Sequence, residues 1–292
     1  TYFVEPMSAV NANNALRELA MKEKKEIERI LAELSAEAAA HREDISDNYR
    51  LLTQLDVIFA KARLSYQMRA GAPVMNDQGQ IDLKKARHPL IDPKAVVPIT
   101  LRLGTDFDSM IITGPNTGGK TVAIKTVALN CMMAQTGLHV ACREADICMC
   151  SGFLCDIGDG QDMSENLSTF SSHIVNVLDI LKKVDRDSLV ILDELGSGTD
   201  PAEGMGIAVA ILEELKKSAL FLVTTHYPEV KQYAERAEGM VNARMTFDKE
   251  SLKPTYRLVI GEAGESCAFY IAGKLGMPEP MLECAARAAY GA

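Results

Sequence analysis

The part of the sequence that most directly indicates chemistry is a glycine-rich stretch containing one lysine and one threonine. It fits the pattern GxxxxGK[ST] and reads Gly114-Pro115-Asn116-Thr117-Gly118-Gly119-Lys120-Thr121. Glycines let the backbone curl until its N–H groups point inward, where they add to the positive end of a helix dipole. Lys120 is then expected to reach the β- and γ-phosphates of a nucleotide, and Thr121 to offer its hydroxyl to Mg²⁺. The stretch therefore predicts a site for a nucleoside triphosphate, taken to be ATP, together with magnesium.

A pair of carboxylates follows a hydrophobic run farther along the chain. The run Leu189–Leu192 leads directly into Asp193 and Glu194. Asp193 is expected to complete the magnesium site, and Glu194 to orient and deprotonate the attacking water. His226 ends a later apolar run, where a histidine can hydrogen-bond the γ-phosphate or the lytic water. The sequence thus predicts ATP hydrolysis, with Lys120, Glu194 and His226 as the catalytic residues.

A stretch rich in hydroxyl groups lies between the loop and the acidic pair. It extends from Ser164 to His173 and opens a helix that is predicted to run to Lys183. Hydroxyl groups at a helix start are ordinary caps, but they also suit a second anion site at the positive end of the dipole. The residues alone leave both interpretations open. His173 is expected on the packed face of that helix.

These side chains need strands and helices to position them. Three apolar runs read as buried central strands, at residues 110–113, 189–192 and 220–224. Helices are expected to begin near Gly119, Ser164 and Pro201. Alternation of strands and helices favours an α/β fold with a mostly parallel sheet. In such a sheet, ligands bind at the carboxyl ends of the strands, where the acidic pair is predicted to lie.

A long helical pattern precedes this region, from about Asn14 to Met68. Apolar residues recur at three- and four-residue steps, while charged residues of both signs occupy the opposite face. Neither proline nor glycine interrupts the pattern, and Gly71-Ala72-Pro73 ends it. One or two long helices are expected. They would form a lever or coiled-coil arm, or else a helical hairpin packed on its neighbour.

The charge balance limits the kinds of partner. With 40 acidic and 31 basic residues the net charge is -9, which argues against the whole chain acting as a general polyanion binder. There is no signal peptide and no apolar run of the ~18 residues that a membrane span needs, so we expect a cytoplasmic protein without a membrane partner. The chain opens without Met, directly in the strand-like Thr1-Tyr2-Phe3-Val4, and closes within a helical pattern. We therefore expect it to be a fragment of something longer.

The cysteines raise the question of zinc. Four of them lie close together in the sequence, at Cys142, Cys148, Cys150 and Cys155, but no CxxC pair occurs among them. Alternation within a strand explains Cys148 and Cys150 as core residues. Reduced thiols in the cytosol are the plainer interpretation.

Taken together, these stretches resemble the ATPase domain of the MutS family, which has an ABC-type P-loop NTPase fold. The matching motifs are the glycine-rich loop, Ser168-Thr169-Phe170, the stretch Asp193-Glu194-Leu195-Gly196-Ser197-Gly198-Thr199, and Thr225-His226. Arg87-His88-Pro89-Leu90 and residues 199–204 resemble the type-two bacterial branch rather than the mismatch-recognition branch. The resemblance implies a homodimer in which each nucleotide lies between one subunit's phosphate loop and Ser168 of the partner subunit.

The resemblance also implies a division into three segments. Residues 1–80 would be a helical core and lever segment, and residues 81–260 an ABC-type ATPase domain. Residues 261–292 would be a helical dimerisation element, with a plain helical cap on the sheet as the alternative. Type-two proteins typically continue into a small nuclease-like domain, so any nuclease activity is expected outside these residues.

The type-two branch is associated with suppressing homologous recombination by binding branched DNA, and with splitting stalled ribosomes. We therefore expect an ATP-driven dimer clamp acting on DNA structures. A ribosome-splitting ATPase is one alternative, and an ATP-gated DNA-binding switch with incidental turnover is another. A transporter or chromosome-organising ABC ATPase is disfavoured, because Leu167-Ser168-Thr169-Phe170-Ser171 departs from an LSGGQ-type signature.

Overall fold

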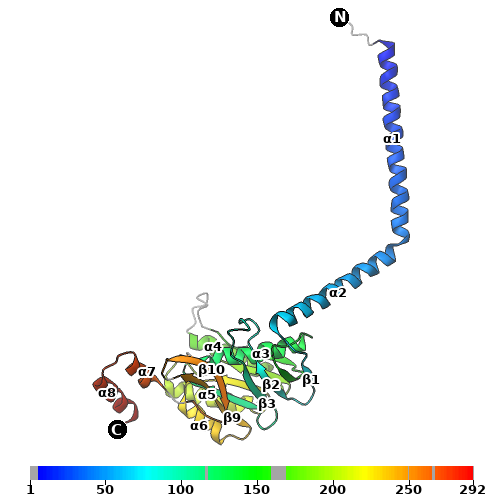
Figure 1. Ribbon diagram of the computed structural model, residues 1–292. Coiled ribbons are helices and arrows are strands. Elements are labelled where there is room, and N and C mark those ends of the chain that lie inside the picture. The colour runs from blue at the N-terminus through cyan, green and yellow to red at the C-terminus, as the bar shows by residue number, and fades with distance from the viewer. Residues whose placement is uncertain (1–5, 116–117, 159–168, 249, 265–266, 292) are drawn as a thin grey trace. The chain divides into compact units, whose positions relative to one another are not determined.

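The computed structural model describes residues 6–115, 118–158, 169–248, 250–264 and 267–291 (Figure 1). Its Cα positions divide the chain into two compact units, residues 1–62 and 63–292. The strand-like opening expected at Thr1–Val4 lies outside the described residues.

The described residues of the first unit are helical, as predicted. Helix α1 spans Met7–Ala40 and α2 spans Arg42–Met68, with the break between them at His41. No residue of α1 is buried, and Met68 is the one buried residue of α2. Charges stabilise the helix surface locally, since Arg29 pairs with Glu26 and Glu33 at 2.6 and 2.5 Å.

The second unit is built around a sheet of six described strands in the order β10-β9-β4-β8-β7-β6. Their bounds are β4 Ser109–Thr113, β6 Gly152–Asp156, β7 Ser188–Leu192, β8 Leu220–Thr224, β9 Met240–Asp248 and β10 Lys253–Ile260. Strands β9, β4, β8, β7 and β6 pair in parallel, and β10 is antiparallel to β9. The three predicted central strands are therefore confirmed as β4, β7 and β8.

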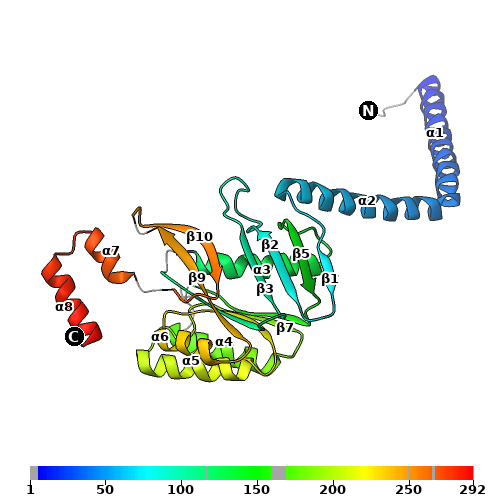
Figure 2. The ribbon, with the colours of Figure 1, turned by 60° about the horizontal axis from the view of Figure 1, so that its bottom comes forward.

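Helices cover both faces of this sheet (Figure 2). On one face lie α4 (Thr169–Lys183), α5 (Pro201–Leu215) and α6 (Pro228–Arg236), and on the other lies α3 (Lys120–Gln135). Successive side chains of a strand point to opposite faces, so Ile111 packs in the core under α4–α6 while Met110 and Ile112 pack in the core under α3. Burial on both faces explains why these strands read as unbroken apolar runs.

A second, smaller sheet packs against the outer side of α3, and the sequence reasoning did not anticipate it. Its described strands are ordered β1-β5-β2-β3, with bounds Val74–Asn76, Glu144–Cys148, Ile81–Ala86 and Ile99–Leu103. Contacts of α3 with both β2 and β8 place this helix between the two sheets (Figure 2). Cys148 and Cys150 are buried in the shared core, as the alternation predicted.

The last described helices are α7 (Ala268–Lys274) and α8 (Glu279–Tyr290), which contact each other. Neither contains a buried residue. In the described part of the chain, no helix combines the length and the apolar character that crossing a membrane requires.

Candidate active site

The phosphate loop connects β4 to α3. Thr113 ends the strand and Lys120 begins the helix, with Gly119 at its N-cap in the left-handed region at φ 90°. A Cβ placed on Gly119 would lie 2.5 Å from Cδ1 of Tyr256. Glycine is therefore required at this position for both its backbone conformation and its lack of a side chain. Asn116 and Thr117, also predicted to bind phosphate, lie outside the described residues.

Lys120 is buried, at 2% exposure, and its amine points back into the loop. Nζ donates to the carbonyl of Gly114 at 2.8 Å and lies 3.1 Å from Nε2 of His226. Burial lowers the pKa of Lys120 to about 8, even though Glu194 and Asp193 oppose that shift. The predicted phosphate-binding lysine is thus held inside the loop, where a bound triphosphate would favour its charged form.

Asp193 lies at the carboxyl end of β7, as predicted. Thr121 donates to its Oδ2 at 2.6 Å, and Thr224 at the end of β8 donates to its Oδ1. The structure thus brings together the two predicted magnesium ligands. A hydroxyl and a carboxylate beside a phosphate loop supply the oxygen ligands that Mg²⁺ prefers, since this ion is held by one or two carboxylates plus substrate phosphates. The residues present fit the ion.

Glu194 adopts a strained backbone conformation, with φ at 51°. Its N–H donates to Oγ1 of Thr224 at 2.8 Å, which holds the turn after β7 in place. Its Oε1 lies 3.8 Å from Nε2 of His226, and both side chains are partly exposed. Non-glycine residues held at positive φ cluster at active sites. The turn directs this carboxylate toward His226 and the mouth of the loop.

His226 follows β8, and the structure brings it to the same edge of the sheet as Lys120 and Glu194. Burial, reinforced by the charge of Lys120, lowers the pKa of His226 below its ordinary value. A neutral imidazole can accept a hydrogen bond from the Lys120 amine at Nε2 and carry its own proton on Nδ1. In that form His226 is a hydrogen-bond acceptor beside Lys120 rather than a second cation.

An apolar pocket adjoins the loop, and the sequence reasoning missed it. Its volume is about 270 Å³, and its lining combines loop, helix and strand residues: Ile91, Ala95, Val96, Val97, Ile99, Gly119, Val122, Ala123, Thr126, Met245 and Tyr256. Tyr256 has φ at 55°, and the pairing of β10 with β9 shifts register between Pro254 and Leu258. A bulge of this kind re-aims a side chain, here onto Gly119. No spacing rule in the sequence links Tyr256 to the loop.

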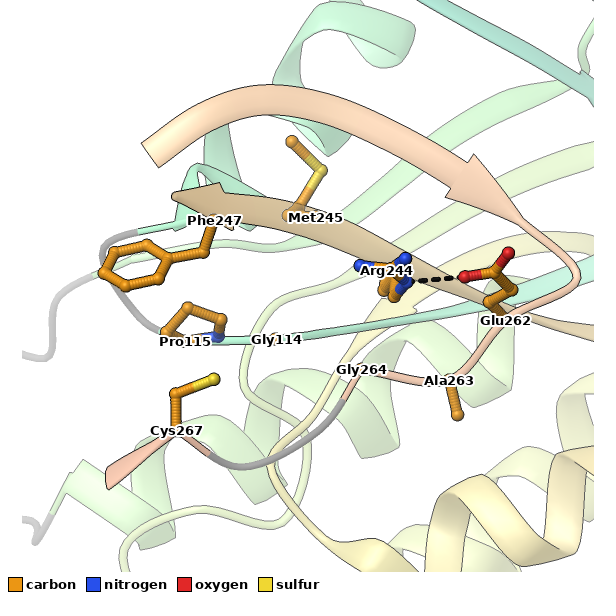
Figure 3. Close-up of a pocket in the computed structure, with 9 residues that line it drawn as sticks. All are labelled: Gly114, Pro115, Arg244, Met245, Phe247, Glu262, Ala263, Gly264 and Cys267. Carbon is orange, nitrogen blue, oxygen red and sulfur yellow. Dashed lines mark hydrogen bonds and ion pairs between the residues drawn. The ribbon is translucent and has the colours of Figure 1, made fainter. Parts of the chain in front are cut away.

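A polar pocket borders the beginning of the loop (Figure 3). Arg244 and Glu262 form an ion pair of 2.8 Å in its wall, and Gly114 and Gly264 line it as well. The Gly264 N–H donates to Oγ1 of Thr113 at 2.7 Å, and a Cβ on Gly264 would lie 2.9 Å from the Gly114 nitrogen. The segment after β10 is thus fastened directly to the start of the phosphate loop.

Two residues from the hydroxyl-rich stretch remain. Ser168, expected to act on the partner subunit's nucleotide, lies outside the described residues. His173 lies on α4 with its side chain 26% exposed, and its Nδ1 is 2.8 Å from Oδ2 of Asp156. The contact of His173 with the carboxylate of Asp156, rather than apolar packing, accounts for its position on the helix.

Comparisons with known proteins gave matches over most of the chain. Residues 110–290 match the family model described as MutS domain V. A protein named "Endonuclease MutS2" from Lachnospira eligens is 53% identical over 284 residues, covering 97% of this chain and 36% of that protein. Proteins of the same name from Caldanaerobacter subterraneus and Clostridium botulinum are each 50% identical over 285 and 287 residues. The chain spans 36% of the length of these relatives.

Proposed function

The chain belongs to the MutS family, in its type-two branch, and carries the ATPase domain of that family. We propose that it binds ATP with Mg²⁺ and hydrolyses it as a homodimer that acts on DNA structures. One observation carries the proposal. Lys120 at the start of α3 and the consecutive residues Asp193 and Glu194 after β7 converge within hydrogen-bonding networks at one edge of the sheet.

Each residue at this edge has a proposed role. Lys120 binds the β- and γ-phosphates, and Thr121 with Asp193 holds Mg²⁺, which when bound neutralises charge on the phosphates. Glu194 orients and deprotonates the attacking water. His226 hydrogen-bonds the γ-phosphate or that water. The 3.8 Å between His226 and Glu194 leaves room for both to contact one small group near the loop.

We assign the apolar pocket to the base of the nucleotide. It shares Gly119 with the phosphate loop, so a triphosphate bound along the loop would bring its nucleoside to the pocket mouth. Tyr256 covers this position and offers an aromatic ring for stacking. The polar pocket of Figure 3 is less suited to a purine, because its wall contains the ion pair of Arg244 and Glu262.

The proposed dimer is supported by the C-terminal helices. Large apolar side chains of this region are exposed, namely Tyr270, Leu275, Met277, Met281 and Tyr290. Exposed apolar groups gathered on one short segment are typical of interaction surfaces. We propose that residues 261–292 pair the subunits, residues 81–260 form the ATPase domain and residues 1–80 form the lever segment. The compact units divide at residue 62, within α2.

The target of the whole protein is a proposal as well, because the relatives are nearly three times as long as this chain. We propose that the closing dimer moves the attached helices against branched DNA in the cytoplasm and so suppresses homologous recombination. With a net charge of -9, DNA contact is expected from local patches and from parts of the protein beyond these residues. A ribosome as target and an ATP-gated switch are the two competing functions.

The proposed function is tested by calorimetry with Mg-ATP on the parent protein and on Lys120→Ala. Saturable binding by the parent and none by the variant supports it. A folded parent that binds no adenine nucleotide overturns it. Turnover by the full-length protein, measured with four-way DNA junctions and with collided ribosomes, then separates the targets. If neither the junctions nor the ribosomes stimulate ATP turnover, the ATP-gated switch is favoured.

A further inference from the structure

Asp156 is a buried carboxylate at the carboxyl end of β6, the edge strand beside β7. Both of its oxygens are occupied by the same helix. His173 Nδ1 lies 2.8 Å from Oδ2, and Asn176 Nδ2 donates to Oδ1 at 2.8 Å. A carboxylate that is 8% exposed is costly without such partners. The structure therefore holds Asp156 and α4 in a fixed mutual position.

The two partners of Asp156 are three residues apart and so share a face of α4. The same helix packs Val177 and Ile180 into the core under the sheet. Apolar packing is non-directional, so it holds a helix against a sheet without fixing its rotation. Two hydrogen bonds from one helix face to the same carboxylate have a defined geometry and fix that rotation.

The backbone of Asp156 reaches the magnesium-binding edge. Its carbonyl accepts a hydrogen bond of 2.8 Å from the N–H of Asp193, the residue that Thr121 contacts through its side chain. One residue thus bonds the nucleotide-binding strand through its main chain and α4 through its side chain. Helix α4 begins at Thr169, which follows Ser168 in the sequence.

We propose that Asp156 is a positioning residue for ATP turnover that acts through His173 and Asn176 to orient α4. This inference rests on the proposed function, in which the start of that helix meets the nucleotide of the partner subunit. None of Asp156, His173 and Asn176 is among the residues that we propose to contact the nucleotide of their own subunit. Their loss is expected to reduce turnover while leaving nucleotide binding to the subunit's own loop unchanged.

The test compares His173→Leu with His173→Asn in the full-length protein. The asparagine amide places a donor close to the position of Nδ1, whereas leucine fills the space without one. We expect His173→Leu and Asp156→Asn to lower kcat about 10- to 100-fold, as misplaced reactive groups do. We expect His173→Asn to stay within about threefold of the parent, with ATP affinity at the loop unchanged in every variant. Asp179→Asn, an exposed carboxylate on the same helix, is the matched control and should leave kcat unchanged.

Hydrogen exchange of the α4 amides supplies a readout that does not depend on turnover. Exchange over the first turns of α4 should speed up in His173→Leu and Asp156→Asn but not in His173→Asn. The inference is overturned if His173→Leu keeps the parent's kcat and exchange, or if leucine and asparagine reduce kcat equally. A parent that hydrolyses no ATP contradicts the proposed function instead, and the exchange pattern still decides whether Asp156 orients the helix.

Discussion

Thr121 and Asp193 are joined by a hydrogen bond of 2.6 Å between Oγ1 of the threonine and Oδ2 of the aspartate, although 72 positions separate them in the sequence. This contact links the first turn of α3 to the end of β7. Because Thr224 donates to the other oxygen, the protein itself orients the carboxylate from two sides. The fold thus sets the orientation of the carboxylate that we propose as a ligand of Mg²⁺.

Replacing Asp193 by Asn should abolish magnesium-dependent turnover. The amide keeps the shape of the side chain but removes the charge that holds the ion, whose stabilisation of the phosphates is worth several kcal/mol. We expect kcat to fall by at least about 100-fold at saturating ATP and Mg²⁺. Nucleotide binding measured with a chelator present should match the parent. Unchanged kcat in this variant would contradict the assignment of Asp193.

Replacing Glu194 by Gln should separate binding from hydrolysis. Gln tolerates the same backbone and keeps the side-chain length, so the turn after β7 should persist. It cannot accept a proton from water, and loss of general-base catalysis lowers rates by about 10²- to 10⁴-fold. Calorimetry should show parent-like ATP affinity, while phosphate release should almost cease. If the purified variant hydrolyses ATP like the parent, another residue positions the water.

ATP affinity should fall as the pH rises through the pKa of Lys120, which burial lowers to about 8. Above that pH the amine of the nucleotide-free protein is neutral, so binding a triphosphate must also bring a proton onto Lys120. The affinity then decreases by up to about tenfold per pH unit above 8. Calorimetry in buffers of different ionisation enthalpy should detect this proton uptake. In Lys231→Met the same decline should begin at a higher pH, because the charge of Lys231 contributes to lowering the pKa of Lys120. A flat profile in the parent would contradict the prediction.

Replacing Tyr256 by Ala should weaken binding of ATP but not of inorganic triphosphate. An aromatic contact contributes about 0.5–1.5 kcal/mol beyond the area it buries, so we expect roughly a 3- to 10-fold loss of ATP affinity. Tyr256→Phe keeps the ring and should bind like the parent. Equal weakening of ATP and triphosphate would place the base elsewhere.

Replacing Gly119 by Ala should destabilise the protein as well as impair the loop. The left-handed conformation costs a residue with a Cβ about 1–2 kcal/mol, and here the Cβ also meets the ring of Tyr256. The free energy of unfolding from urea titration should fall by at least that amount. Gly206 is the matched control, since it lies within α5 with open space around it. Gly206→Ala should leave stability unchanged or raise it.

The sequence predicted the parts of the site that depend on local patterns. The phosphate loop is a contiguous motif, and β4, β7 and β8 are recognisable because both of their faces are buried. Parallel strands then bring their carboxyl ends to one edge, which is why the predicted association of Lys120, Asp193, Glu194 and His226 is seen in the structure.

The parts that were missed depend on long-range register. Tyr256 reaches the loop through a bulge in β10, and a bulge leaves no signature in the alternation of side chains. Asp156 and His173 are 17 positions apart, and neither residue type indicates its partner. The smaller sheet combines β1, β2 and β3 with β5 from beyond α3, so its pairing cannot be read from neighbouring segments.

The fastening of Gly264 to the loop determines where this protein can be shortened. Thr113 Oγ1 donates to the Ala243 carbonyl and accepts from the Gly264 N–H, while Lys231 donates to the Gly264 carbonyl at 2.5 Å. A version cut at residue 260 would leave a buried hydroxyl half satisfied and a half-buried lysine without that acceptor, at about 1–3 kcal/mol for each group. Such a version is expected to bind nucleotide more weakly because the phosphate loop is destabilised, whether or not the subunits pair. A monomeric ATPase core should therefore be obtained by substituting exposed side chains of α7 and α8, with the chain kept intact through Gly264.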